Sequence, residues 1–263
     1  MYIDIAINLA SKKFELNRSA LIERALQVGL THQIILASDL AEAEEVWLLC
    51  DSYPNLFASV GIHPYQACTW QSDSLSKMNR LHEHPCVIAV GACDLDEHYN
   101  DSEPLQQREA LTTQLEFAVE NRPLILHERD AFDNFSALLN SFPVQGVLYC
   151  LISDKKALKH DLDSGLYRGI IGWIGDERCE KLLQELVNYI PDDRLFMETD
   201  VPDLLPRDLT KKPSSRRNEP YYLPHLAKRI AFLGSQSLEE LSQYGWQNFQ
   251  TLFPCAKMDG LTS

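Results

Sequence analysis

Eight short runs rich in Val, Ile and Leu recur along this chain, and they constrain its fold more than any other feature. The runs are residues 2–8, 33–38, 56–62, 87–92, 124–127, 146–152, 167–174 and 194–199. Between them, segments such as SALIERALQVGL and REALTTQLEFAVENR have the apolar periodicity of amphipathic helices. Apolar strands that alternate with helices are typical of a parallel sheet covered on both faces. Eight such units in 263 residues predict a TIM (β/α)8 barrel, with an open doubly wound sheet as the alternative.

The sequence has the features of a single domain. No long Gly/Ser-rich or Pro-rich linker interrupts it, and 45% of its residues are hydrophobic, which is enough to bury one large core. We therefore predict a single α/β barrel domain over residues 1–263. One segment differs: residues 207–225, RDLTKKPSSRRNEPYYLPH, are loop-like and basic and follow the eighth run. In a barrel, a connection at that place lies on the catalytic face.

Charge and cysteine content limit the partners of the chain. A formal net charge of −14 argues against a general polyanion-binding surface, so any contact with nucleic acid has to be local. The seven cysteines form no CxxC pair, and we interpret them as buried free thiols of a reducing compartment. The first apolar run is too short for a membrane span and has no basic segment ahead of it. We expect a cytoplasmic monomer without membrane association.

Ionisable residues gather where the predicted strands end. His63, Asp94, His127 and Asp200 all lie at such places, and in a barrel these ends share one face. Histidine and carboxylate together are the ligands of a divalent ion that activates water, so the pattern indicates metal-assisted hydrolysis. Structural interpretations stay open for two of them, because His63 precedes a proline and suits a strand-end cap, and Asp200 suits a helix cap.

Several longer stretches resemble the TatD family of metal-dependent deoxyribonucleases, which belong to the amidohydrolase-like barrels. They are GIHPYQA (61–67), LILHERDAFDNF (124–135), METDVPDLLPRDL (197–209) and KKPSSRRNEPYYLPH (211–225). The similarity extends from the first strand to QNFQTLF near the C-terminus. The resemblance implies a TIM barrel that holds one or two divalent ions (Mg, Mn or Zn). It also implies phosphodiester hydrolysis of the 3'-5' exonuclease type.

The resemblance assigns roles to four residues. His127 and Asp200 match metal ligands of the family, and His63 matches a histidine near the substrate phosphate. We therefore expect His63 and Asp200 to be catalytic. Asp96 matches the last position of the family's strand-four motif, and we assign it to substrate binding.

Two further family ligands are missing. The strand-four motif Gly-Glu-x-Gly-Leu-Asp reads GACDLD here, so Ala92 stands where the family has glutamate. Tyr149 stands where a histidine ends strand six, and a phenol is a poor substitute for a neutral imidazole. Asp94, two residues further on, and Glu128, directly after His127, are candidate substitutes. Because two matched ligands remain, we expect metal binding to be weak or absent.

Two functional hypotheses follow. The first is a divergent TatD-like hydrolase with a weakened metal site, and the second is an inactive barrel that acts as a binding or interaction protein. For the first, the basic loop would contact DNA or a small phosphate ester. Its basic residues are Arg207, Lys211, Lys212, Arg216 and Arg217. The alternative for this loop is a solvated segment in which Arg216 or Arg217 pairs with Glu219.

Overall fold

A computed structural model describes residues 1–99, 101–150, 154–171 and 180–256. Eight strands follow one another in a single sheet in chain order. They are β1 (Tyr2–Ile7), β2 (Leu30–Leu36), β3 (Leu56–Val60), β4 (Val87–Asp96), β5 (Leu124–Arg129), β6 (Gly146–Leu148), β7 (Tyr167–Ile170) and β8 (Leu195–Met197). The segment after β8 returns to β1, because the Asp200 N–H donates to the Ala6 carbonyl and Ile7 bridges Val201 in parallel. The predicted TIM (β/α)8 barrel is confirmed.

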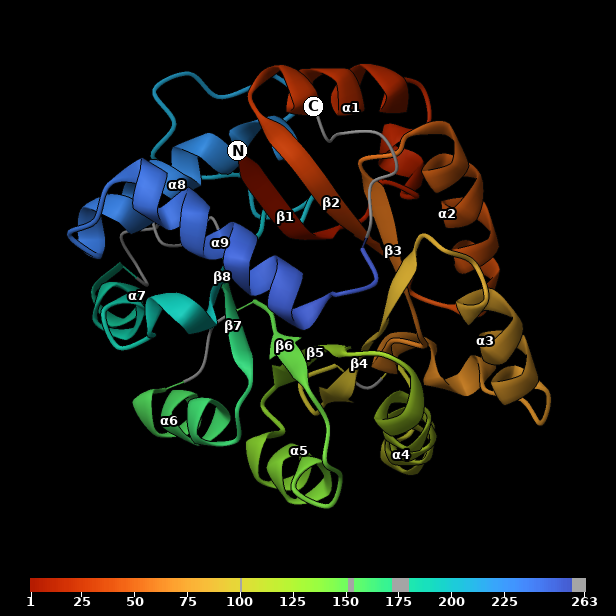
Figure 1. Cartoon of the computed structure of the whole chain (residues 1–263). Coiled ribbons are helices and arrows are strands. Elements are labelled where there is room, and N and C mark those ends of the chain that lie inside the picture. The colour runs from red at the N-terminus through yellow and green to blue at the C-terminus, as the bar shows by residue number, and fades with distance from the viewer. Residues whose placement is uncertain (100, 151–153, 172–179, 257–263) are drawn as a thin grey trace. The chain divides into compact units, whose positions relative to one another are not determined.

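Helices connect the strands (Figure 1). Within the described residues they are α1 (Arg18–Gln27), α2 (Leu40–Ser52), α3 (Ser74–His82), α4 (Pro104–Asn121), α5 (Phe132–Leu139), α6 (Lys155–Asp163), α7 (Glu180–Val187), α8 (Leu223–Leu233) and α9 (Leu238–Leu252). Short 3-10 turns are η1 (Lys12–Phe14), η2 (Pro64–Thr69), η4 (Asp192–Arg194) and η5 (Pro220–Tyr222). None of the helices that the structure describes has the length and apolar character needed to span a bilayer. The cytoplasmic location and the monomeric state stay predictions.

The contacts within the chain group it into two compact units. The first unit comprises residues 1–34 and 149–251, and the second comprises residues 35–148 and 252–263. The single-domain organisation over residues 1–263 therefore stays a prediction. In the first unit, apolar side chains of α8, such as Leu226 and Ile230, pack with Ile170 of β7 and Met197 of β8 in one buried core.

The second unit holds β3, β4, β5 and β6. Figure 1 shows α2, α3 and α4 along the outer side of β3 and β4. Gln114 of α4 fixes the end of β3, because its amide accepts a hydrogen bond from the Ile62 N–H (2.7 Å) and donates one to the Ile62 carbonyl (3.1 Å). His63 directly follows Ile62, so Gln114 fixes the position from which His63 extends.

The strands agree with the predicted runs in position, and β4 is longer than predicted. The apolar pattern indicated an end at Ala92, whereas the strand continues to Asp96 with all ten residues buried. The pattern fails there because Asp94 and Asp96 are buried acids with hydrogen-bond partners. The predicted ends of the sixth and seventh runs, at residues 152 and 174, lie outside the described residues.

His82, the last residue of α3, makes the stability of the fold depend on pH. It is buried, its Nε2 donates to the Val60 carbonyl (3.2 Å), and burial lowers its pKa to about 4. An unfolded histidine has a pKa of about 6.5, so between these values the unfolded chain binds more protons. The contribution of His82 to the free energy of unfolding is complete above pH 6.5 and is lost as the pH falls toward 4. It amounts to roughly 3 kcal/mol in full.

We predict that His82→Gln, which keeps a donor for Val60 but cannot titrate, gives a shallower fall in stability below pH 6.5. Urea unfolding of both proteins between pH 7 and pH 4.5 measures this. Parallel pH profiles would contradict the assignment.

Candidate metal centre

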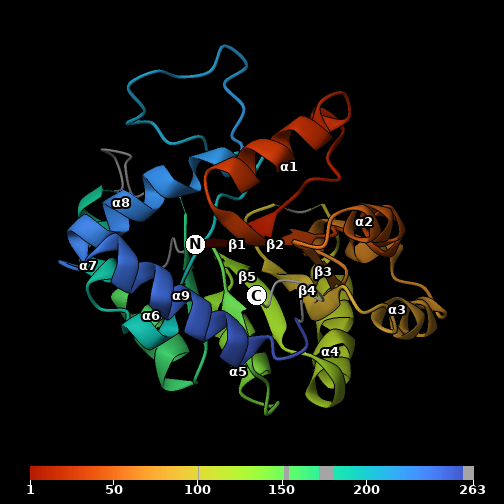
Figure 2. The same ribbon diagram turned by 45° about the horizontal axis from the view of Figure 1, so that its top comes forward.

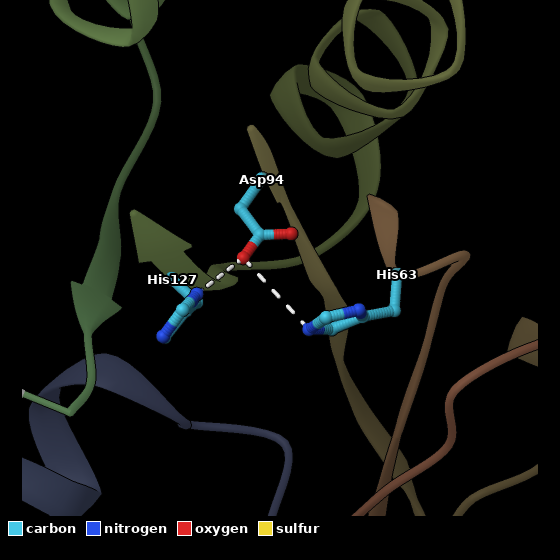
Figure 3. Close-up of side chains that lie close together, drawn as sticks. All are labelled: His63, Asp94 and His127. Carbon is cyan, nitrogen blue, oxygen red and sulfur yellow. Dashed lines mark hydrogen bonds and ion pairs between the residues drawn. The ribbon is translucent and has the colours of Figure 1, made fainter. Parts of the chain in front are cut away.

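Three side chains from neighbouring elements of the second unit converge on one point (Figure 3). Asp94 of β4 and His127 of β5 are register partners, and Asp94 Oδ2 lies 2.7 Å from His127 Nδ1. His63, which follows β3, places its Nε2 3.9 Å from the same oxygen. One ligand atom from each residue lies within 4.8 Å of the others, and no other group of this kind occurs among the described residues. All three extend from the carboxyl ends of parallel strands.

A β-bulge in β4 delivers Asp94 to this point. Gly91 pairs with Ile125 and Cys93 with Leu126, so Ala92 is left out of the register. Gly91 has φ +133°, and a Cβ there would lie 2.2 Å from the Ile125 carbonyl oxygen. Only glycine tolerates this close approach. The extra residue shifts every later position of β4, which is why Asp94 faces His127.

The cluster is buried, and one of its oxygens lacks a partner. The Asp94 side chain is fully buried, whereas His63 is 15% exposed and His127 is 10% exposed. Asp94 Oδ1 has no hydrogen-bond partner among the described residues. A buried carboxylate oxygen without a partner is costly unless an ion or a donor meets it. An imidazole and a carboxylate with such an oxygen, with a second imidazole beside them, fit a divalent metal ion.

Hydrogen bonds indicate the tautomers of the two histidines. His127 Nδ1 donates to Asp94 Oδ2, so Nε2 is the nitrogen that would coordinate an ion, and in Figure 3 it points away from the carboxylate. His63 Nδ1 accepts from the Tyr65 N–H (3.3 Å), which leaves the proton on Nε2 facing the cluster. Burial lowers the pKa of His63, against the opposing influence of Asp94, so the ring is neutral at pH 7. His63 is therefore both the predicted strand-end cap and an N–H donor within the cluster.

The other acids of these strands have different partners. Asp96 is buried: its Oδ1 accepts from the N–H groups of His98 (2.8 Å) and Tyr99 (2.7 Å), and its Oδ2 accepts from the Tyr65 hydroxyl (3.0 Å). Its predicted contact with substrate stays a prediction. Glu128 Oε1 accepts from the Ala131 N–H (2.7 Å). Of the two predicted substitutes, Asp94 lies in the cluster and Glu128 does not.

An aromatic and cationic surface adjoins the cluster, and we call Tyr65, Tyr99 and Arg129 the aromatic shelf. The ring of Tyr65 packs edge-on against His63 (4.4 Å between centroids) and against Tyr99 (5.7 Å). The Arg129 guanidinium lies 4.6 Å from the centre of the Tyr99 ring, and Tyr99 is 44% exposed. Sequence reasoning missed this shelf, although Tyr65 belongs to GIHPYQA and Arg129 to LILHERDAFDNF.

Asp200 and Tyr149 belong to the first unit. Asp200 follows β8, has φ +55° and donates its N–H to the Ala6 carbonyl; Tyr149 is buried. Joint metal binding by His127 and Asp200 stays a prediction.

Two buried acids, Asp4 and Glu198, lie in the same unit as Asp200. Burial raises the pKa of Asp4 to about 7 and raises that of Glu198 well above its ordinary value. Asp4 accepts from the Thr199 N–H (3.0 Å) and hydroxyl (2.6 Å). Sequence reasoning missed Asp4. The feature that could have identified it is a single acidic residue within an apolar strand.

The basic loop contains one arginine with a structural role. Figure 2 shows the long connection between β8 and α8 extending past α8 and α1. Arg217 donates to the Lys13 carbonyl, lies 4.7 Å from the centre of the Phe14 ring and is 3.6 Å from Glu219. Lys211, Lys212, Arg207 and Arg216 are exposed. The predicted pairing of Arg217 with Glu219 is thus present, and substrate contacts of Arg207, Arg216 and Arg217 stay predictions.

Comparison with known proteins identifies the family. A family model described as TatD related DNase matches residues 3–254. The chain belongs to the TatD related DNase family. A 3'-5' ssDNA/RNA exonuclease TatD from Salmonella typhimurium is 38% identical, covering 95% of this chain and 98% of that protein. The protein of the same name from Dickeya dadantii is 40% identical, with 95% and 97% covered. The crystal structure of a TatD homologue from Escherichia coli superposes with a TM-score of 0.87 at 25% identity, covering 96% of this chain and 98% of that one.

Asp94 should control metal binding in this TatD protein. We expect Asp94→Asn to weaken the binding of Mn2+ roughly 10- to 100-fold, because the amide can still accept from His127 Nδ1 but loses the negative charge that makes this ring a stronger ligand. Titration calorimetry measures the affinity. The matched control is Glu128→Gln, which keeps an acceptor for the Ala131 N–H and should bind metal as the wild type does. Equal losses in both variants would contradict a special role for Asp94.

Proposed function

We propose that this chain is a metal-dependent nuclease that removes nucleotides from the 3' end of single-stranded DNA or RNA. The His63, Asp94 and His127 cluster is the observation that carries the proposal, because it supplies ion ligands at the carboxyl ends of barrel strands. The relatives named 3'-5' ssDNA/RNA exonuclease support it by aligning over 95% of the chain.

In this proposal Asp94 replaces the glutamate that the family has at the position of Ala92. The bulge at Gly91 brings Asp94 to His127 at hydrogen-bond distance, and its second carboxylate oxygen has no partner in the described structure. His127 Nε2 would hold the ion, Asp94 would orient this ring through Nδ1, and Asp200 is the further ligand that the family resemblance predicts. Imidazole with carboxylate suits Mn2+ and Zn2+ more than Mg2+. With Tyr149 in place of the family's histidine, the affinity is lower than that of a complete ligand set.

Each residue then has a chemical task. A bound divalent ion supplies an activated water and neutralises charge on the phosphate. Asp94 fixes the ring of His127 through Nδ1, which sets the direction of Nε2. His63 carries its proton on Nε2 and donates it as a hydrogen bond to a phosphate oxygen. Asp96 holds Tyr65 and the His98–Tyr99 turn in place around them.

The aromatic shelf would bind the base of a terminal nucleotide. Bases of single strands stack on exposed aromatic rings, and this recognition tolerates any sequence. Tyr99 is exposed, its backbone is anchored to buried Asp96, and Arg129 lies over its ring. Exposed cations of the basic loop would contact phosphate groups of the substrate.

A specific observation also favours the second hypothesis, that of an inactive barrel acting as a binding protein. Two positions that carry metal ligands in the family are occupied by Ala92 and Tyr149, and both side chains are buried. A barrel without these metal ligands would keep its fold and the aromatic shelf but would not catalyse hydrolysis.

Four proteins assayed in parallel on a 3'-labelled single-stranded oligonucleotide separate the two functions. We expect wild-type protein to shorten the strand with added Mn2+ or Mg2+, and Asp94→Ala to lose about 100-fold or more in rate. Glu128→Ala should remain active, and Ala92→Glu combined with Tyr149→His should change the rate little. A chelator control excludes contaminating nuclease. An inert wild type that gains activity only in the combined variant would favour the binding protein.

The aromatic shelf is tested by Tyr99→Ala. Loss of one base stack should raise KM for the oligonucleotide roughly 5- to 100-fold while kcat changes much less. Tyr244→Ala, at an exposed tyrosine of α9, is the matched control. A fall in kcat alone, or equal effects in the two variants, would contradict base stacking on Tyr99.

A further inference from the structure

A second group of reactive side chains lies at the other end of β4. Cys86 directly precedes this strand, and its Sγ lies 3.0 Å from Nδ1 of His84. The Nε2 of the same ring lies 3.2 Å from Asp51 Oδ1, beside the end of α2. Cys50, next to Asp51 on the last turn of α2, has a buried thiol whose pKa the neighbouring Cys86 thiol raises. All four residues belong to the second unit.

The hydrogen bonds make His84 a proton acceptor for Cys86. The backbone N–H of Cys86 donates to His84 Nδ1 (3.3 Å), so this nitrogen carries the lone pair and the ring proton is on Nε2. Nε2 then donates to the Asp51 carboxylate. A thiol, an imidazole and a carboxylate in this order form the arrangement that activates nucleophilic cysteines.

The two thiols differ in reactivity. The nearby Cys86 thiol, followed by burial, raises the pKa of Cys50, which therefore remains a protonated thiol at neutral pH. Cys86 is half-buried and His84 is 22% exposed, so the pair of residues is reachable from solvent. A surface groove of about 480 Å³ lies against His84, whose ring stacks on Trp47. Small molecules can therefore reach the ring that faces the Cys86 sulfur.

We propose that Cys86 is a peroxide-reactive thiol and that Cys50 is its resolving partner. His84 accepts the Cys86 proton, and the sulfur attacks one oxygen of a small hydroperoxide. The O–O bond breaks, the leaving oxygen takes the proton from His84 as water or an alcohol, and Cys86 becomes a sulfenic acid. Cys50 then attacks this sulfur, the S–O bond breaks, and the hydroxide leaves as water with the Cys50 proton. One hydroperoxide is reduced and two thiols become one disulfide.

The site is separate from the metal centre. Cys86 precedes the first residue of β4, whereas Asp94 lies near the last, so the two sites occupy opposite ends of one strand. A disulfide would join the end of α2 to the start of β4. The sequence interpretation of all the cysteines as buried thiols was wrong for Cys68 and Cys255, which are exposed, and for Cys86, which is half-buried. Cys179 lies outside the described residues.

The experiment exposes the full chain to hydrogen peroxide without reductant and follows it by mass spectrometry. We expect the mass to fall by two hydrogens and a non-reducing digest to contain the Cys50–Cys86 linked peptides. Cys50→Ser should instead accumulate a sulfenic acid on Cys86 that dimedone traps. His84→Gln should slow oxidation of Cys86 about tenfold or more, because the proton acceptor is lost. Circular dichroism before treatment confirms that each variant is folded.

The control is Cys68→Ser, which removes an exposed thiol of the same unit and should leave the disulfide and its rate unchanged. Cys255 is the competing site, because it is exposed and accepts a hydrogen bond from Arg122 (2.9 Å). Faster oxidation of Cys255 or Cys68 than of Cys86, an unlinked Cys50, or an unchanged rate in folded His84→Gln would overturn the proposal.

Discussion

The close packing of three strands at Gly61, Gly91 and Ile125 determines where the metal centre lies. A Cβ on Gly61 would lie 2.8 Å from Gly91 Cα, and a Cβ on Gly91 would lie 2.2 Å from the Ile125 carbonyl oxygen. The backbones of β3, β4 and β5 are thus closer here than side chains allow. The cluster lies just beyond this row: His63 and His127 are each two residues further along, and Asp94 is three. The additional residue in β4 is the bulge at Ala92, which brings Asp94 into register with His127.

The sequence predicts the positions of the strands well because burial on both faces requires continuous apolar runs. It does not predict the length of β4 or the residue that faces His127, because both depend on a bulge that forms where a glycine meets the carbonyl of a neighbouring strand. Asp94 could be named as a substitute for the lost glutamate, but so could Glu128. Only the register distinguishes them, since one pairs with His127 and the other caps the start of α5 at Ala131. The sequence could not decide whether His63 caps the end of its strand or belongs to a functional site. The structure supports both roles.

Four buried acids in the strands or near their ends differ in their surroundings. Asp96 accepts from two backbone N–H groups and a hydroxyl, and these hydrogen bonds order the loop that carries Tyr99. Asp4 and Glu198 are dominated by desolvation, which favours their neutral forms. Asp94 differs from these three acids because one oxygen is bonded to an imidazole and the other has no partner among the described residues. Composition cannot reveal this difference, because all four residues are acids near strand ends or in strands.

The acidity of the chain bears on how such a site would hold a nucleic acid. A net charge of −14 gives little general attraction for phosphates, and Arg217 of the basic loop is already engaged with Glu219 and the Lys13 carbonyl. Base stacking needs no net positive charge, and the exposed ring of Tyr99, with Arg129 over it, would offer such a surface next to the cluster. A nuclease that binds in this way makes few phosphate contacts, so its affinity depends only weakly on salt concentration. It also requires unstacked bases, which makes a single-stranded end a better fit to this surface than a duplex.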